Sequence, residues 1–351
     1  MNENKSKGIS NRLKRRKRLL IGIATLILII IMIFFVDFAS FLQKIIIIGP
    51  IGLLAFIITY TIAFILRAYK LKLIFKGISK EISYSTSYFS IGASFFINGV
   101  IPGKVGDVAK IFIIKDQENI GLGESTAGIA VERILDMILL FIISCFALIY
   151  LYLSNIGEAS SKKFLGLSIE FYLIIGAVLI IGILIIIFLS LYKTETIIKI
   201  ISKISPKIAH YVERFIINFK RGIKELRKNK RILAYVILLG IPVYLIDGFI
   251  IVILFYALGY QLNVLILILA INLSFFSQIF PITPGGWVIS ENIGSLFIYF
   301  FYASLFPEGY EAILAIFIIE HLFKQVYILF FGGYSIFRFN FSLKQIEDMK
   351  E

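Results

Sequence analysis

The chain has 351 residues, of which 59% are hydrophobic and 17% are charged, with a mean hydropathy of +0.93 and a formal net charge of +14. A soluble domain carries about a quarter charged residues, and the runs of Ile, Leu and Phe here exceed what one water-soluble core can bury. This composition excludes an ordinary soluble enzyme and predicts an all-α polytopic membrane protein. The single cysteine, Cys145, excludes a disulfide framework and a thiolate metal site.

The basic residues are concentrated next to apolar runs. They fill the N-terminal segment 1–18, which directly precedes the first run, and they dominate the segment 192–231. Short basic loops beside spans follow the positive-inside rule, so the positive charge argues against nucleic acid as a partner. We expect both segments and the tail 338–351 to be cytoplasmic, in a protein of the plasma membrane. The run 19–36 is followed by no small-residue cleavage site and is predicted to be an uncleaved signal-anchor.

Several stretches are long enough to cross the hydrocarbon core, which takes about 20 apolar residues in a helix. They are 45–66, 127–153, 169–191, 232–257 and 311–337. With the shorter run 19–36 they predict about six full transmembrane helices. By alternation, the loop 67–81 is expected inside and the loop 154–168 outside.

Two further regions, 84–115 and 264–306, contain short apolar pieces interrupted by Pro-Gly. Proline removes a backbone donor and glycine weakens a helix, and such a break must be buried in protein or line a wet cavity. Each region is therefore predicted to form a re-entrant or broken hairpin, for eight or so membrane segments in total. Two thin full crossings stay open as the alternative. The break residues are Pro102, Gly103, Gly106, Pro284, Gly285 and Gly286.

The order span, span, hairpin, span occurs twice, in residues 19–153 and 169–337. Each hairpin region contains Ser-Phe-Phe, at Ser94 and Ser274, ahead of its Pro-Gly break. Arg67 and Asp247 each lie 27 residues before that serine. The alternation of the spans gives the two halves opposite membrane orientations. The pattern predicts an inverted repeat, as in many secondary transporters.

Ionisable residues inside or beside these segments are functional candidates, because each costs about 2.5–3.5 kcal/mol at the centre of a span. We expect them to contact a lipid headgroup or a coupling ion in a polar cavity between the two Pro-Gly tips. The alternatives are snorkelling at the membrane surface and structural ion pairs between helices. The candidates are Asp107, Lys110, Glu132, Arg133, Asp136, Asp247, Glu291, Glu320, His321 and Lys324.

Signals of enzyme chemistry are weak. The sequence has no Gly-rich phosphate loop, no HExxH and no Cys–His constellation, so we predict no catalytic residue, no metal and no cofactor, and a transporter rather than an enzyme. Apolar residues recur at helical spacing between Thr194 and Leu226, interrupted by Pro206. This indicates one or two helices, either interfacial on the anionic leaflet or packed on the domain.

Three short motifs carry a resemblance: "PGKVGDVAK" at 102–110, "VERILD" at 131–136 and "PGGWVISE" at 284–291. Their order is similar to the flippase-like membrane domain of lysylphosphatidylglycerol synthases, also called multiple peptide resistance factors. Asp107 and Lys110 replace the glutamate and arginine usual in that family, and Lys lacks the bidentate fork of Arg. The resemblance implies translocation of an anionic phospholipid or a polyprenyl-linked lipid.

The two-domain members of that family carry an aminoacyl-transfer domain after the membrane part. This chain ends at Glu351, about fourteen residues past its last predicted span, so we expect translocation rather than aminoacyl transfer. Two alternatives remain. One is a membrane-embedded transferase that uses Glu132, Asp136 and His321 on a lipid substrate. The other is a non-catalytic membrane partner of a separate lipid synthase or glycosyltransferase.

Overall fold

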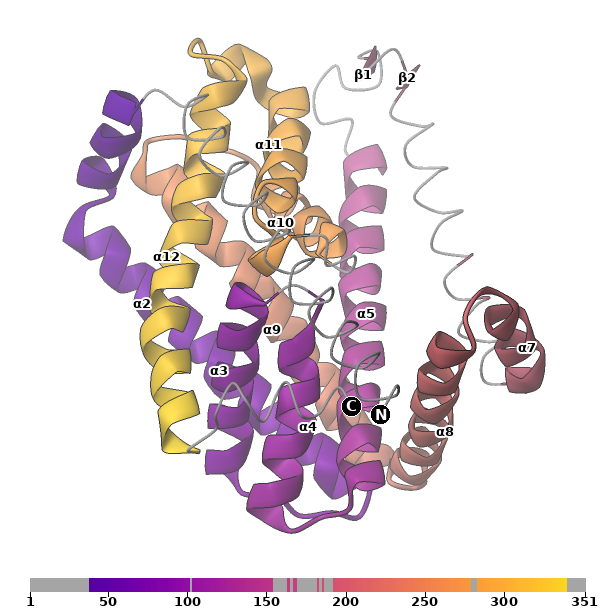
Figure 1. Ribbon diagram of the computed structural model, residues 1–351. Coiled ribbons are helices and arrows are strands. Elements are labelled where there is room, and N and C mark those ends of the chain that lie inside the picture. Colours follow the sequence, from indigo (N-terminus) through magenta and orange to yellow (C-terminus); the bar gives the residue numbers. More distant parts are fainter. Residues whose placement is uncertain are drawn as a thin grey trace, which may run out of the picture. The chain divides into compact units, whose positions relative to one another are not determined.

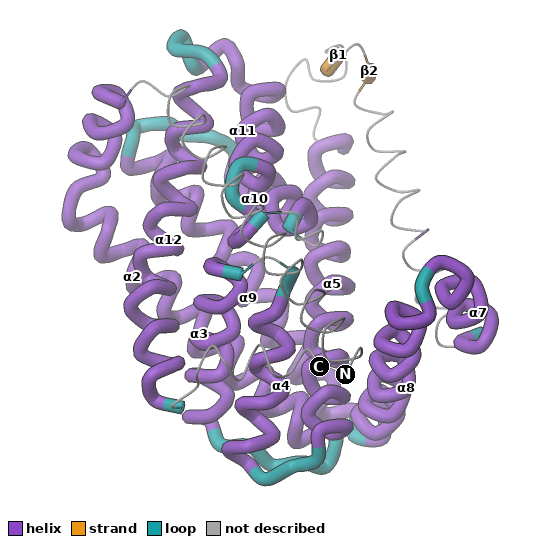
Figure 2. Tube along the Cα trace, viewed as in Figure 1, coloured by secondary structure: helices purple, strands orange, loops and turns teal. Residues whose placement is uncertain are grey.

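The computed structural model describes residues 38–101, 103–153, 192–278 and 283–339, with a few further positions between 163 and 185. The described residues are helical almost throughout (Figures 1 and 2), which confirms the predicted all-α fold. The exception is a two-residue antiparallel pair, β1 (Lys163–Phe164) with β2 (Leu167–Ser168). The predicted span 19–36, nearly all of 169–191 and the break residue Pro102 lie outside the described residues.

The helices follow the predicted order. The first set is α2 (Phe38–Gly77), α3 (Tyr84–Val100), α4 (Val105–Glu118) and α5 (Leu122–Leu153). After α7 (Thr194–Ile204) and α8 (Pro206–Lys228) come α9 (Lys230–Ala257), α10 (Val264–Ser277), the single turn η2 (Pro284–Gly286), α11 (Ile289–Tyr302), the single turn η3 (Ala303–Leu305) and α12 (Tyr310–Arg338). In the described part of the chain, four stretches are long and apolar enough to cross a membrane: α2, α9, Pro284–Leu305 and α12. The protein is therefore a multi-pass membrane protein.

Helix α2 is longer than the sequence predicted. It spans 40 residues and continues to Gly77, so the prediction of a loop at 67–81 is wrong for most of that segment. The helix bends near its start, where Gly49 has φ 60° and Pro50 follows. A left-handed residue before proline interrupts the helical hydrogen bonds, and glycine is the residue that adopts this conformation at least cost. Gly49 thus divides α2 into a short segment and a long one.

Both hairpins consist of two short helices with a break between them. Helices α3 and α4 have 17 and 14 residues, and α10 and α11 have 14 each. At 1.5 Å per residue these arms are roughly 21 to 25 Å long, shorter than a hydrocarbon core of about 30 Å. Two arms of this length match the predicted broken hairpins. Whether the second hairpin re-enters or crosses with help from its flanking turns stays a prediction.

The connection from α2 to α3 and the connection from α9 to α10 have the same local structure, 180 residues apart. Ser79 and Gly259 are both left-handed, with φ 61° and 86°. In the first connection the N–H of Lys80 donates to the carbonyl of Phe75 at 2.9 Å, and in the second that of Tyr260 donates to Phe255 at 2.9 Å. This is the Schellman pattern that closes a helix C-terminus.

The helices that follow begin alike as well. Ser83 Oγ accepts the N–H of Thr86 at 3.0 Å, and Asn263 Oδ1 accepts the N–H of Ile266 at 3.4 Å. Ser83 and Asn263 are again 180 positions apart. Two different side chains therefore perform the same N-cap function at one shared register. The matching caps support the predicted duplication, while the opposite membrane orientation of the two halves stays a prediction.

The repeated cap yields a paired stability prediction. Ser79 is exposed and left-handed, a conformation that costs a non-glycine residue about 1 kcal/mol. Ser79→Gly should therefore raise the apparent unfolding midpoint in detergent, and Gly259→Ser should lower it. A Cβ at Gly259 would meet no atom within 4 Å, so the loss of stability would come from the backbone conformation and not from a clash. If both substitutions move the midpoint in the same direction, the cap interpretation is wrong.

The chain divides into two compact units, each built from three separate stretches. Unit one takes residues from Met1–Tyr60, Gly92–Ala109 and Gly248–Phe337, and unit two from Thr61–Ile91, Lys110–Asp247 and Arg338–Glu351. Each unit contains residues of both predicted repeats. The repeat bounds themselves stay a prediction.

The basic segment 192–231 forms the two helices α7 and α8, with Pro206 at the first position of α8, where its missing N–H costs nothing. Helix α8 packs against α5. Its apolar side buries Ile216, Phe219 and Leu226, and a Cβ on Gly222 would lie 2.8 Å from Val131. For α8 the structure therefore favours the alternative of a helix packed on the domain.

Candidate functional site

The predicted site residues fall into two groups, one in each unit. Lys110, Glu132, Arg133, Asp136 and Asp247 belong to unit two, and Asp107, Glu291, Glu320, His321 and Lys324 to unit one.

Unit two contains a cluster of ion pairs, here called the buried ion cluster: Lys70, Lys110, Glu132, Arg133 and Asp136. Lys110 Nζ donates to Glu132 Oε2 at 2.6 Å, and Lys70 donates to Asp136. Arg133 Nη2 lies 3.1 Å from Glu132 Oε1 and 3.6 Å from Asp136 Oδ2. The residues come from α2, α4 and α5, so the cluster ties the first hairpin to the helices before and after it.

Burial and charge make this cluster an anion-binding candidate. The side chains of Lys70, Lys110 and Glu132 are at most 3% exposed, whereas that of Arg133 is 35% exposed. Three cations face two carboxylates, which leaves one positive charge among these five residues. Desolvation of charged groups is costly unless they are paired. An anion that reached the exposed edge of Arg133 would balance this charge.

Arg67 of α2 and Asp247 of α9 form an ion pair in the same unit, and Asp247 is buried. The two residues are 180 positions apart, the same offset as the two repeated caps. The sequence placed them at equivalent positions of the two repeats. Contact between equivalent positions is expected only beside the axis that relates two repeats, because elsewhere such positions are far apart. The pair therefore agrees with the predicted internal symmetry.

The first hairpin tip, in unit one, is closed by side chains of α3. Asn98 Oδ1 accepts the N–H of Gly106 at 2.7 Å, and Ser94 Oγ donates to Asp107 Oδ1 at 3.2 Å. A Cβ on Gly106 would lie 2.0 Å from the carbonyl oxygen of Ser94, so only glycine permits this approach of α4 to α3. Asn98 thus satisfies a backbone N–H group at the break. Asp107 is thus held at the N-terminus of α4, where the helix dipole stabilises a carboxylate.

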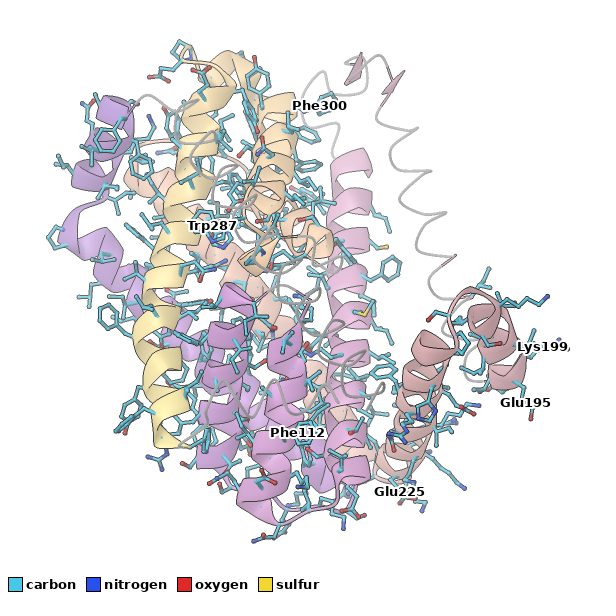
Figure 3. All side chains as sticks on the ribbon, viewed as in Figure 1. Phe112, Glu195, Lys199, Glu225, Trp287 and Phe300 are labelled. Carbon is cyan, nitrogen blue, oxygen red and sulfur yellow. The ribbon has the colours of Figure 1, made fainter. Side chains whose placement is uncertain are left out.

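A second polar group in unit one, here called the histidine site, consists of Trp287, Glu291, His321 and Gln325. His321 Nδ1 is hydrogen-bonded to Glu291 Oε1, and its Nε2 lies 3.1 Å from Gln325 Nε2. Ser290 Oγ donates to Glu291 Oε2 at 3.1 Å. The ring of Trp287, labelled in Figure 3, stacks on the imidazole at 4.1 Å and 9°. Every polar atom of the imidazole therefore has a partner.

Gln325 places this site beside both hairpin tips. A Cβ on Gly99, near the end of α3, would lie 3.0 Å from Gln325 Oε1. A Cβ on Gly285, in the second break, would lie 2.8 Å from Gln325 Nε2. Gly285 has φ 64°, so glycine is also favoured there by the backbone. Both predicted tips thus approach one side chain of α12.

The remaining predicted pair lies on α12, where Lys324 and Glu320 form an ion pair one turn apart. Both are nearly buried, and the Lys324 ammonium lies 5.0 Å from the ring centre of Phe275 and 5.9 Å from that of Tyr60. Such contacts stabilise a cation away from water. In this structure Lys324 is held within the protein rather than snorkelling.

Three residues of these clusters were missed by sequence reasoning. Lys70 was assigned to a loop, and neither Gln325 nor Trp287 was a candidate. Gln325 lies one turn after His321 on the same face of α12, which is a usable signal. The stacking of Trp287 depends on the left-handed turn through Gly285 and Gly286, and no sequence pattern predicts that geometry.

The chemistry of these groups is that of ion pairing and proton exchange. Among the described residues, no three His, Cys, Asp or Glu side chains are grouped to hold a metal ion. Glu132 and Asp136 each accept a hydrogen bond from a lysine. Unit two therefore presents a buried cationic cluster, and unit one a buried imidazole–carboxylate pair.

Comparison with known proteins matches the chain to a family of membrane domains. The sequence model of the family described as "Lysylphosphatidylglycerol synthase TM region" matches residues 19–332. Two UPF0104 membrane proteins of Methanocaldococcus jannaschii are 26% and 24% identical to the chain, over 68% and 69% of it and over 92% and 72% of their own lengths. Glycosyltransferase AglD of Haloferax volcanii is 21% identical over 95% of this chain. The chain spans just over half of AglD, 56% of its length. No solved structure matches the chain.

Proposed function

The chain belongs to the family of the lysylphosphatidylglycerol synthase transmembrane region, and from this we propose that it moves an anionic lipid or a lipid-linked intermediate between the leaflets of the cell membrane. The observation that carries the proposal is the buried ion cluster, in which three cations face two carboxylates beside a broken hairpin. A phosphate headgroup is an anion that this net positive cluster would attract. The acyl or polyprenyl tails stay in lipid throughout.

The cluster lowers the barrier that the hydrocarbon core presents to a headgroup. A charged group costs several kcal/mol in that environment when it is alone. Arg133 is one-third exposed and offers a planar fork that matches phosphate oxygens, while Lys110 behind it is held by Glu132. The headgroup thereby exchanges water for fixed, charged donors. The protein is then a transporter of the plasma membrane with its N-terminus, its C-terminus and the helices α7 and α8 in the cytoplasm.

The direct test is leaflet exchange in proteoliposomes. Vesicles would contain a fluorescently labelled phosphatidylglycerol, phosphatidylcholine or polyprenyl phosphate. Exchange would be measured by chemical quenching of the label in the outer leaflet. We expect exchange of the anionic lipids to exceed that in protein-free vesicles, and phosphatidylcholine to exchange more slowly. Exchange no faster than in protein-free vesicles for all three lipids would contradict the proposal.

Arg133→Gln is the informative variant in this assay. Loss of one charge-assisted contact to phosphate is expected to slow exchange of the anionic lipid about tenfold or more, since such a bond contributes about 1.5–3 kcal/mol. Arg214→Gln on α8 is the matched control, because Arg214 is an exposed arginine of the same unit. If both variants exchange lipid at the wild-type rate, Arg133 does not bind the headgroup.

A second function has one observation in its favour. The chain aligns over nearly its whole length with part of a protein named as a glycosyltransferase. This supports a non-catalytic membrane partner that holds a lipid for a separate glycosyltransferase. That function predicts saturable binding of a polyprenyl phosphate to the purified protein without any exchange between leaflets, so the same vesicles distinguish the two.

A further inference from the structure

The histidine site has the chemistry of a reversible proton acceptor inside a membrane helix. His321 and Glu291 are 7% and 2% exposed, and they come from α12 and α11. Histidine is the side chain whose ordinary pKa lies near physiological pH. A buried histidine with an anionic partner can carry a charge that an isolated one could not. Addition of a proton would change the net charge of the pair from −1, a neutral imidazole beside a carboxylate, to zero, an imidazolium beside a carboxylate.

Gln325 allows both protonation states to be fully hydrogen-bonded. In the structure its amide nitrogen faces His321 Nε2, which suits a neutral ring that donates from Nδ1 to Glu291 and accepts at Nε2. A proton from the aqueous side would add to the lone pair of Nε2. The amide would then rotate and present its carbonyl oxygen as the acceptor. In a buried site an unsatisfied donor or acceptor costs about 1–3 kcal/mol. A side chain that can hydrogen-bond the imidazole in both protonation states avoids this cost.

Trp287 adds a preference for the charged state. Its ring lies parallel to the imidazole with centroids 4.1 Å apart, and an aromatic face attracts a cation. Trp287 is itself packed against Leu314, Ala315 and Ile318 of α12, so it is fixed above the imidazole. An added charge on His321 would therefore have stabilising groups at its edge and on its face.

The other charged and titratable groups around the site already have partners. Glu320 and Lys324 on α12 pair with each other. Tyr310 at the start of α12 donates to Asn292 of α11 at 2.6 Å. Asp107 at the first tip accepts from Ser94. Among the described residues, Glu291 is thus the carboxylate in contact with His321.

Given the proposed lipid transport, we propose that Glu291 and His321 form the proton-binding site that couples lipid movement to a proton gradient. The coupling element is Gln325, whose amide contacts the imidazole and lies beside Gly99 and Gly285 at the two tips. Rotation of this amide would place its nitrogen beside Gly99 and its oxygen beside Gly285, the reverse of the arrangement in the structure. Proton binding would therefore change which polar group of Gln325 faces each tip.

The protein contains its own reporter for this site. Trp287 is the single tryptophan among the 351 residues, and His321 is one of two histidines. A protonated imidazole in contact with an indole quenches its fluorescence. We expect the emission of the purified full-length protein in lipid nanodiscs to fall reversibly as the pH is lowered through one transition. The measurement needs neither lipid transport nor a known cargo.

Three variants assign the transition. His321→Gln should abolish it, whereas His210→Gln should leave it unchanged, because His210 is exposed on α8. Glu291→Gln should move the midpoint down by about 1–3 pH units, the effect of removing an adjacent opposite charge. Monodisperse elution and wild-type helicity confirm folding for each. A transition that is absent in the wild type, or that persists in His321→Gln, would overturn the proton site.

Coupling is tested in the proteoliposomes with an imposed pH gradient. We expect the gradient to change the ratio of inward to outward lipid exchange about tenfold per pH unit at most, and His321→Gln to remove that dependence from the exchange that the variant retains. Exchange that ignores the gradient in the wild type would overturn the coupling and leave the transport function standing. Exchange absent in all vesicles contradicts the transport function and with it the coupling, while the fluorescence titration decides the proton site by itself.

Discussion

Glu132→Leu is expected to destabilise the protein more than any other single charge removal, by about 3–5 kcal/mol, or to prevent folding. Lys110 is 1% exposed and would lose the carboxylate that receives its 2.6 Å bond. The cluster would then hold three cations against one carboxylate. The measurement is the apparent unfolding midpoint in detergent, or the yield of monodisperse protein if unfolding is irreversible.

Two further variants separate loss of charge balance from loss of shape. Glu132→Leu combined with Lys110→Met removes the pair together and should recover most of the lost stability, because a buried ion pair replaced by apolar residues is often neutral. Glu225→Leu on α8 is the control, since Glu225 pairs with Lys228 at the surface, where such a pair contributes about 0–1 kcal/mol. Equal losses in Glu132→Leu and in the double variant would show that packing rather than charge dominates.

The second large effect is expected at the first hairpin tip. Gly106→Ala would place a Cβ 2.0 Å from the carbonyl oxygen of Ser94, and this atom belongs to the backbone of α3 and cannot rotate away. Helix α4 must therefore shift, which breaks the bond from Gly106 to Asn98 and moves Asp107 from Ser94. We expect a loss of about 3 kcal/mol or more, together with loss of lipid exchange.

Gly123→Ala on α5 is the matched control. Its Cβ would meet only Asn218 Oδ1 at 3.5 Å, an ordinary contact, and alanine favours a helix over glycine by about 1 kcal/mol. This variant should be as stable as the wild type or slightly more so. A Gly106→Ala protein that unfolds at the wild-type midpoint would show that the two helices of the hairpin are not held as closely as the structure has them.

The helices and their breaks could be predicted from the sequence because their signals are local. Apolar length identified α9 and α12, and Pro-Gly located the breaks between α3 and α4 and between α10 and α11. Proline and glycine act within one turn of their own position. The error at 67–81 has the same origin, since Lys70 looks like a surface charge when its neighbours in space are unknown.

The ionisable residues were visible in the sequence, but their partners were not. Lys70 meets Asp136 across 66 positions, Arg67 meets Asp247 across 180, and Glu291 meets His321 across 30. A single charge inside a span shows that some partner must exist, because the lipid cannot solvate it. Which residue that is depends on how the helices pack.

Hydrophobic length, breaks and the presence of intramembrane charge therefore follow from the chain, since each arises from residues within a few turns. The division of these charges into a buried ion cluster and a histidine site arises only in the folded protein. So do the stacking of Trp287 on His321 and the approach of Gly99 and Gly285 to Gln325. The physical reason is that pairing and stacking energies act over a few ångströms, and only folding brings distant segments within that range.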